Sequence, residues 1–168
     1  HVRVPLCEPF VISNGVVAEK DGILVELLAD GLCGLGEASP MSGSFYSHHT
    51  PESSWETMIQ KLVPALEKAP RLSLDAGWVP ADADDPFAVA GLDNAMWDLL
   101  ARAHNKPLWQ LLGGDAKKEI ASGLAVGIYK TIDELLERVE RYLAAGGYRR
   151  VKIKIKPGWD IVLLEAIR

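Results

Sequence analysis

The first forty residues carry the pattern of antiparallel strands. Strands are predicted over 2–6, 22–30 and 32–37. Asp30-Gly31, between the last two, is a dipeptide typical of tight hairpin turns. Between the first two strands, several turn-forming residues predict a loop over 9–15. The chain is therefore expected to begin with an antiparallel sheet.

Apolar residues then recur with the period of helices. Thr50 can cap the first of these helices, and Pro51 suits its first position. Gly113-Gly114 ends the third helix. Helices are predicted over 51–66, 87–103 and 107–112, with an irregular connection over 70–86.

After residue 120 the pattern becomes strand, helix, strand, helix. Residues 121–129 are a mostly apolar run typical of a buried parallel strand. A helix begins at a capping box over 131–134 and ends at Gly146-Gly147. A strand that contains lysines follows, and another helix begins at Asp160. This order implies right-handed parallel crossovers. The sequence thus predicts an α+β domain up to about residue 115, joined to the start of a parallel β/α domain.

Three lysines alternate with valine and isoleucine between Arg150 and Lys156. With a side-chain period of two, Lys152, Lys154 and Lys156 share one face of the predicted strand. If that face is enclosed, mutual repulsion and loss of water both favour the neutral amine. A lysine lowered from its ordinary pKa of about 10.4 can transfer protons near neutral pH.

The same alternation is also typical of an exposed edge strand, because lysine discourages edge-to-edge aggregation. The position in the fold supports a functional role as well, so both interpretations stay open at this point. In parallel β/α folds, ligands and catalytic groups gather at the C-terminal ends of the strands, and Lys154 and Lys156 lie near that end.

Composition narrows the function classes. The chain has 168 residues, of which 48% are hydrophobic and 24% charged, as in an ordinary soluble domain with a real core. A net charge of −5 argues against a dedicated nucleic-acid binder. Two cysteines, Cys7 and Cys33, suggest reduced thiols in a cytoplasmic protein, and no apolar run is long enough to span a membrane.

Two loops are further candidates for binding. The Ser39–His49 loop offers Phe45 and Tyr46 for apolar contact, whereas its adjacent histidines, His48 and His49, would rarely face one metal ion. A loop that covers substrate is therefore favoured over a metal site. In the 9–15 loop, Ser13 and Asn14 could contact a ligand or merely satisfy a turn.

The remaining features are weaker. Asp93 and Asp98, on the predicted second helix beside Trp97, suit capping or packing better than a catalytic carboxylate pair. The sequence contains no G-x-G-x-x-G, P-loop, nucleophile elbow or C-x-x-C motif.

Several motifs together resemble one family over the whole chain. They are Gly34-Leu35-Gly36-Glu37, the loop Met41 to Ser47, the helical segments Leu92 to Leu100 and Lys106 to Gly114, and above all Lys152-Ile153-Lys154-Ile155-Lys156-Pro157-Gly158-Trp159-Asp160. They resemble the enolase superfamily in its muconate-lactonizing-enzyme-like subgroup. Within it, the branch of o-succinylbenzoate synthase and the N-acylamino acid racemases is the most similar.

This resemblance implies an α+β capping domain, an antiparallel sheet plus helices, followed by the first β/α units of a modified TIM barrel. The capping domain is expected over 1–115 and the incomplete barrel over 116–168. Both ends of the chain look cut, since strand begins at once and the last helix lacks a stop signal. A fragment of a longer protein is expected.

The resemblance also implies a chemistry, the metal-dependent abstraction of a proton next to a carboxylate. Lys154 falls on the family's acid/base, and Lys152 on the cation that supports it and helps to hold the substrate carboxylate. Lys156 lies outside the motif and is expected to be solvated. The metal, Mg²⁺ or Mn²⁺, has its ligands on later strands beyond Arg168, as does a second lysine, so this fragment alone is expected to be inactive.

The preferred activity is that of o-succinylbenzoate synthase, a dehydration in menaquinone biosynthesis. N-acylamino acid racemase, epimerase and cycloisomerase activities of the same superfamily stay open, as does a non-catalytic binding domain with a lysine-rich edge strand. The expected partner is a small carboxylate substrate in a cytoplasmic homo-oligomer, with no nucleic acid and no membrane.

Overall fold

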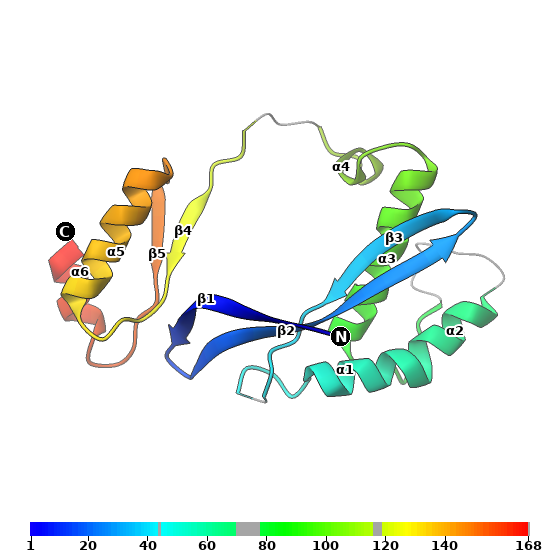
Figure 1. The fold of residues 1–168 in the computed structure, drawn as a ribbon, viewed down its shortest axis with the longest axis horizontal. Coiled ribbons are helices and arrows are strands. Elements are labelled where there is room, and N and C mark those ends of the chain that lie inside the picture. The colour runs from blue at the N-terminus through cyan, green and yellow to red at the C-terminus, as the bar shows by residue number, and fades with distance from the viewer. Residues whose placement is uncertain (44, 70–77, 116–118, 168) are drawn as a thin grey trace. The chain divides into compact units, whose positions relative to one another are not determined.

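The computed structural model describes residues 1–43, 45–69, 78–115 and 119–167. The chain forms two compact units, which are described separately. One comprises His1–Val4 and Lys20–Ala116, and the other Pro5–Glu19 and Lys117–Arg168. The elements are β1 (Val2–Ile12), β2 (Gly15–Ala29), β3 (Leu32–Ala38), α1 (Pro51–Thr57), η1 (Met58–Leu62), α2 (Val63–Lys68), α3 (Pro86–Ala103), α4 (Leu108–Leu111), β4 (Gly123–Val126), α5 (Ile132–Ala145), β5 (Arg150–Ile153) and α6 (Asp160–Ile167) (Figure 1).

The first sheet has the strand order β1-β2-β3, and its β2–β3 pair is antiparallel. The predicted hairpin turn is confirmed, because Asp30 and Gly31 both have positive φ, 51° and 78°, as the tight hairpin turn requires. Ile23 pairs with Ala38, and both are buried, whereas Leu24 on the other face of β2 is exposed. One face of the sheet therefore belongs to the core.

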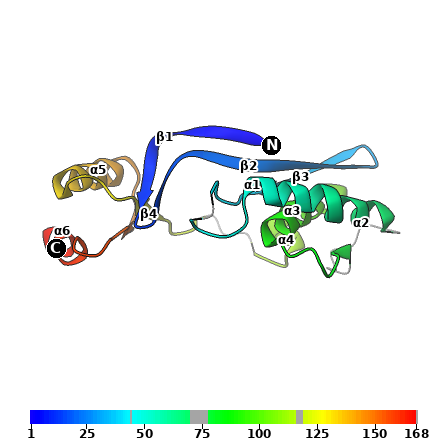
Figure 2. The same cartoon turned by 90° about the horizontal axis from the view of Figure 1, so that it is seen from below.

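Helix α3 covers that buried face at unusually close range. Figure 2 shows α1 and α3 on the same side of β2 and β3. Gly34 and Gly36 of β3 face α3, and a Cβ added at either would collide with its backbone, at Ala95 and Gly91 respectively. Glycine is required here because the two backbones touch. The core between them includes Ile23, Ala38, Met58, Leu62, Ala88 and Leu92.

The first helix begins where the sequence predicts. The Thr50 hydroxyl accepts from the Ser53 N–H, and the Ser53 hydroxyl accepts from the Thr50 N–H, which completes a capping box. The helical path continues through η1, which has the wider π-type turn, into α2. Pro64 explains η1, since proline lacks an N–H and its ring displaces the preceding turn.

Asp98 joins α3 to the edge of the sheet. Its Oδ2 accepts hydrogen bonds from the Leu35 N–H and the Arg102 Nε, each at 2.9 Å. The hydrogen bond from the Leu35 N–H holds the pKa of Asp98 below its ordinary value of 3.8. Burial acts in the opposite direction, and Arg102 lowers the pKa further. Asp98 is therefore a packing partner, as its position on the predicted helix suggested.

This lowered pKa predicts a pH dependence of stability. A carboxyl group with a lowered folded-state pKa stabilises the protein above its unfolded-state pKa, and that contribution is lost as pH falls through the folded-state value. We expect the unfolding midpoint of Asp98→Asn to lie below that of the wild type at pH 6, and the gap to narrow from about pH 4 downward. Thermal denaturation of both proteins at each pH measures the gap. A gap that stays constant or widens toward acid would contradict this role.

The second unit contains the predicted strand–helix–strand–helix order. Strands β4 and β5 are parallel, with Leu124 opposite Val151 and Val126 opposite Ile153. The Thr131 hydroxyl caps α5 by accepting from the Glu134 N–H, as predicted, but the Glu134 carboxylate accepts from the Lys130 N–H. The core of this unit comprises Val126, Leu135, Val139 and Leu163, with Leu124, Tyr129, Ile132, Val151, Ile153 and Trp159 packed against it.

The predicted fold class is confirmed: an antiparallel three-stranded sheet with helices, then parallel strands. Several boundaries were wrong. The loop predicted over 9–15 is a turn at Ser13-Asn14, because β1 runs to Ile12 and β2 begins at Gly15. Pro9 fits within β1, since β1 is an edge strand and one side of it needs no N–H donor. The strand predicted over 121–129 is shorter, Gly123–Val126.

The predicted domains were 1–115 and 116–168. The compact units differ from them in one segment, because Pro5–Glu19 group with the C-terminal residues. The domain division itself stays a prediction. Residues 70–77 of the connection predicted over 70–86 lie outside the described residues. Among the helices that are described, none has the length and apolar character needed to cross a membrane.

Candidate active site

The two candidate catalytic lysines lie at the C-terminal end of β5. The strand ends at Ile153, earlier than the alternation predicted, so Lys152 is its last residue but one and Lys154 follows it directly. The Lys154 N–H donates to the Val126 carbonyl at 3.0 Å, which extends the parallel pairing by one residue. Lys154 is thereby fixed at the strand end, where parallel folds carry their functional groups.

Packing determines which face of the strand the lysines occupy. Val151 and Ile153 pack against the core formed with α5 and α6. Because neighbouring side chains alternate, Lys152 and Lys154 belong to the opposite face. Lys152 is exposed and Lys154 is half-buried. Lys156 is exposed beyond the strand, with its Nζ 5.1 Å from the centre of the Trp159 ring.

The Ser13-Asn14 turn belongs to the same unit as these lysines, and both of its residues are exposed. The Ile128 N–H donates to the Val11 carbonyl at 2.9 Å, two residues before the turn. This bond joins the tip of β1 to the chain just beyond the end of β4. The turn is therefore attached next to the strand end with which Lys154 pairs.

A cavity of about 1090 Å³ lies between residues 6–11 of β1, the end of β4 and α5. Glu8, Tyr129 and Arg138 line it, but neither Lys152 nor Lys154 does. The cavity is on the helix side of the strands. The lysine face, rather than this cavity, is the candidate for chemistry.

The other candidate loop, between β3 and α1, belongs to the first unit, so its position is described only there. Tyr46 is 65% exposed and Phe45 is half-buried. At the start of the loop, the Lys20 Nζ donates to the carbonyls of Ser39 and Pro40, at 3.1 and 3.0 Å. These contacts fix the point where the chain leaves β3.

Asp21, next to Lys20 on β2, is buried and holds the same end of the loop. Its carboxylate accepts from the Ser42 hydroxyl at 2.7 Å and from Arg3 at 2.9 and 3.2 Å. The hydrogen bonds from Arg3 and then Ser42 outweigh burial and hold the pKa of Asp21 below its ordinary value of 3.8. The carboxylate is therefore a charged anchor for the loop.

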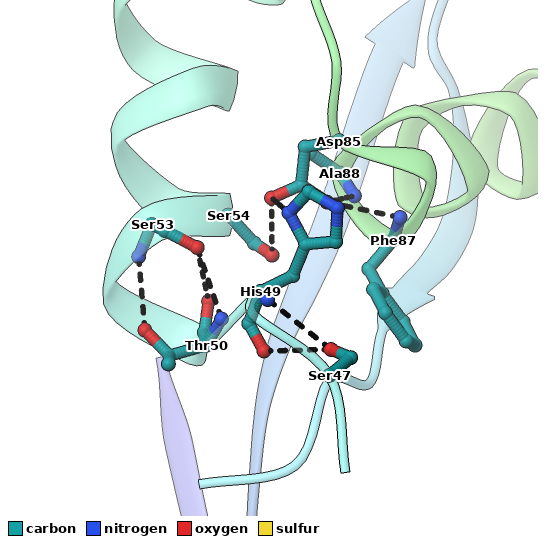
Figure 3. A network of polar contacts seen from close by, with 8 residues as sticks. All are labelled: Ser47, His49, Thr50, Ser53, Ser54, Asp85, Phe87 and Ala88. Carbon is teal, nitrogen blue, oxygen red and sulfur yellow. Dashed lines mark hydrogen bonds and ion pairs between the residues drawn. The ribbon is translucent and has the colours of Figure 1, made fainter. Parts of the chain in front are cut away.

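The far end of the loop is held by a second buried carboxylate, Asp85 (Figure 3). Its Oδ2 accepts from the Ser54 hydroxyl at 2.8 Å and lies 3.3 Å from the His49 Nδ1. Its Oδ1 accepts from the N–H groups of Phe87 and Ala88 and so caps α3. The sequence did not reveal this network, although an aspartate directly before Pro86 is a signal for a helix N-cap.

The histidine pair therefore divides between two environments, since His49 is buried beside Asp85 and His48 is exposed. Within the described part of the chain, no three His, Cys, Asp or Glu side chains gather closely enough to hold a metal ion. The described His, Cys, Asp and Glu side chains therefore do not form a complete metal site.

Comparison with known proteins identifies the family. Residues 1–113 match the model of the mandelate racemase/muconate lactonizing enzyme N-terminal domain. The chain belongs to this family of the enolase superfamily. The resemblance seen in the sequence motifs is thus confirmed.

Curated relatives from this superfamily differ in activity. The chain is 40% identical to an o-succinylbenzoate synthase of Geobacillus kaustophilus, over 100% of this chain and 45% of the relative. It is 34% identical to an N-succinylamino acid racemase of Thermus thermophilus, over 99% of this chain and 45% of the relative. The chain therefore spans about half the length of the curated relatives it matches.

Solved structures share the fold. An enolase-superfamily member from Listeria innocua has a TM-score of 0.86 and 29% identity, covering 100% of this chain and 46% of its own. A dipeptide epimerase from Enterococcus faecalis, complexed with Mg and the dipeptide L-Leu-L-Tyr, has a TM-score of 0.81 and 25% identity, covering 99% and 47%. The epimerase thus combines this fold with bound Mg and a bound dipeptide.

Proposed function

We propose that the full-length protein removes a proton next to a substrate carboxylate, with Lys154 as the acid/base and Lys152 as its supporting cation. The observation that carries this proposal is the position of Lys154 directly at the end of a parallel strand, on the same face as Lys152. Family membership supports it, because enzymes of the enolase superfamily pair a lysine or histidine base with Mg²⁺.

The proposed step transfers one proton from the substrate α carbon to Lys154. The neutral Lys154 amine accepts the α proton and becomes an ammonium, while the C–H electron pair moves into the carboxylate to form an enediolate. A positive charge at Lys152 stabilises the negative charge that develops on the enediolate. In a synthase the enediolate then expels hydroxide from the adjacent carbon. In a racemase a proton returns from the opposite face.

A divalent cation, Mg²⁺ or Mn²⁺, is proposed as the cofactor of the full-length protein, because the Enterococcus epimerase was solved with Mg. When bound, such an ion would supply electrostatic stabilisation to the enediolate. We propose that its ligands come from residues beyond Arg168. The 168-residue chain alone is therefore expected to show no turnover with Mg²⁺ and a succinylbenzoate precursor, and measurable turnover by this chain would contradict the assignment of the ligands.

The preferred activity is the synthase dehydration, supported by the 40% identity to the Geobacillus enzyme. N-acylamino acid racemization is the second candidate, supported by the Thermus relative. The full-length protein with Mg²⁺ should be assayed on the synthase precursor and on several N-succinylamino acids. A kcat/KM at least about tenfold higher for the precursor is expected, and the reverse order would assign the racemase. Activity on neither would leave an epimerase, a cycloisomerase or a non-catalytic binding domain as the alternatives.

Substrate contacts are proposed for Ser13, Asn14, Phe45 and Tyr46, since all four lie on loops rather than in the core. A small-molecule carboxylate is the proposed partner, in keeping with the dipeptide bound to the Enterococcus enzyme. We further propose a homo-oligomer and a cytoplasmic location. The free thiols of Cys7 and Cys33 are in keeping with that location.

A further inference from the structure

The β1 arm, residues 5–19, carries the Ser13-Asn14 turn and belongs to the same compact unit as β4, α5 and β5. One backbone hydrogen bond, from the Ile128 N–H to the Val11 carbonyl, joins the arm to the chain just beyond β4. Gly127 allows this approach, because a Cβ there would lie 3.2 Å from the Val11 oxygen and 3.3 Å from the Phe10 ring. These short-range contacts fix the tip of the arm.

Glu8 makes the side-chain contacts that hold the arm along its length. Its Oε1 lies 2.6 Å from the Arg138 Nη1 and 3.8 Å from the Arg141 Nη2. Its Oε2 accepts a hydrogen bond from the Tyr129 hydroxyl at 3.4 Å. Both oxygens are therefore used, one by α5 and one by the segment that follows β4.

Tyr129 and Arg138 also contact each other, so the three side chains form a closed cluster. The Arg138 guanidinium lies 5.8 Å from the centre of the Tyr129 ring, within the range of a cation–π contact. The Arg138 side chain is only 24% exposed. The Glu8 side chain is 42% exposed, so the pair is held by its several contacts together rather than by burial of both charges.

We propose that Glu8 and Arg138 are positioning residues for substrate binding, because their ion pair fastens the arm whose tip carries Ser13 and Asn14. This inference rests on the proposed function. The arm is held beside the end of β4, and the Lys154 N–H pairs with Val126 of that same strand. The Glu8–Arg138 pair thus sets where the turn lies relative to Lys154, without touching the substrate itself.

The effect should fall on substrate affinity more than on the chemical step, since the lysines are unchanged. In the full-length protein with Mg²⁺, Glu8→Gln and Arg138→Met are each expected to raise KM by about tenfold, the scale of one charge-assisted hydrogen bond, with kcat within about threefold of the wild type. The double variant should be no worse than the single variants, because either change already breaks the pair.

Glu140→Gln is the matched control, because it removes a carboxylate from the exposed face of the same helix, α5. It is expected to leave KM unchanged. If the role of Glu8 were purely structural, Glu8→Gln would lower the thermal midpoint but would not raise KM while kcat stayed near the wild-type value. The effects of Glu8→Gln and Arg138→Met would then also add in the double variant. A wild-type KM in Glu8→Gln, or fully additive effects in the double variant, would overturn the proposal.

Hydrogen exchange gives a readout that does not depend on activity. Amides of residues 8, 10–16 and 128 should exchange about tenfold faster in Glu8→Gln than in Glu140→Gln, because the arm opens more often. Unchanged exchange would overturn the role of Glu8 even if the enzyme proved inactive on every substrate tried. Inactivity of the wild type would refute the proposed function alone, so the two failures are distinguishable.

Discussion

Replacing Lys154 with alanine in the full-length protein is expected to lower kcat by roughly 10²–10⁴-fold, the usual contribution of a positioned general base. The reason is that a proton next to a carboxylate is very weakly acidic, and alanine leaves no group at the strand end to accept it. Fold and thermal midpoint should change little, since Lys154 is only half-buried and lies beyond the last residue of β5. Steady-state kinetics with Mg²⁺, together with circular dichroism, measures both.

Lys156→Ala is the matched control, because it removes the same side chain two residues further on, where the ammonium is exposed beside Trp159. Its kcat is expected to stay within about twofold of the wild type. Lys152→Ala should fall between the two and should raise KM as well, since Lys152 is proposed to hold the substrate carboxylate. Equal losses for Lys154→Ala and Lys156→Ala would contradict the ranking of the lysines.

Gly36→Ala is expected to destabilise the first unit by about 3 kcal/mol, at the upper end of the cost of overpacking. Its Cβ would collide with the Gly91 carbonyl and would lie 2.7 Å from the Ala95 nitrogen. Both are backbone atoms of α3, so no side chain can rotate away to make room. The sheet and helix would have to separate, which would open the core that contains Ile23 and Leu92. Urea denaturation of the wild type and the variant measures the loss.

Gly22→Ala provides the control within the same sheet. Its added Cβ would meet only the Glu37 Oε1 at 3.6 Å, the Ala38 oxygen at 3.7 Å and a Val2 methyl at 4.0 Å, which are ordinary contacts. A change within about 1 kcal/mol is expected. Similar losses in Gly22→Ala and Gly36→Ala would show that close packing against α3 is not what requires glycine at position 36.

Local patterns predicted the elements because their causes are local. The Asp30-Gly31 turn, the Thr50 cap and the apolar run near Val126 each depend on residues within a few positions. The alternation around Lys154 likewise predicted the two faces of β5, which the packing of Val151 and Ile153 now shows. It did not predict that the strand ends at Ile153, because that depends on how many residues β4 offers for pairing.

Contacts between residues far apart in the chain could not be predicted from the sequence. Ser54 and Asp85 are 31 positions apart, and no periodicity links them, yet they share a buried hydrogen bond. Glu8 and Tyr129 are separated by 121 positions and meet only through the fold. Pro9 was misleading because the rule against proline in strands weakens at a sheet edge. The sequence could therefore name the lysines but not the carboxylates that hold the two candidate loops.

The most direct test of the account is exchange of the substrate α proton with solvent. The full-length protein with Mg²⁺ in D₂O is incubated with the carboxylate that it turns over in the assays of the synthase precursor and the N-succinylamino acids, and the α-proton signal is followed by NMR. We expect the wild type and Lys156→Ala to incorporate deuterium at similar rates, and Lys154→Ala to lose at least about 10²-fold in rate while remaining folded. Exchange by Lys154→Ala at the wild-type rate would contradict the central claim that Lys154 carries the proton.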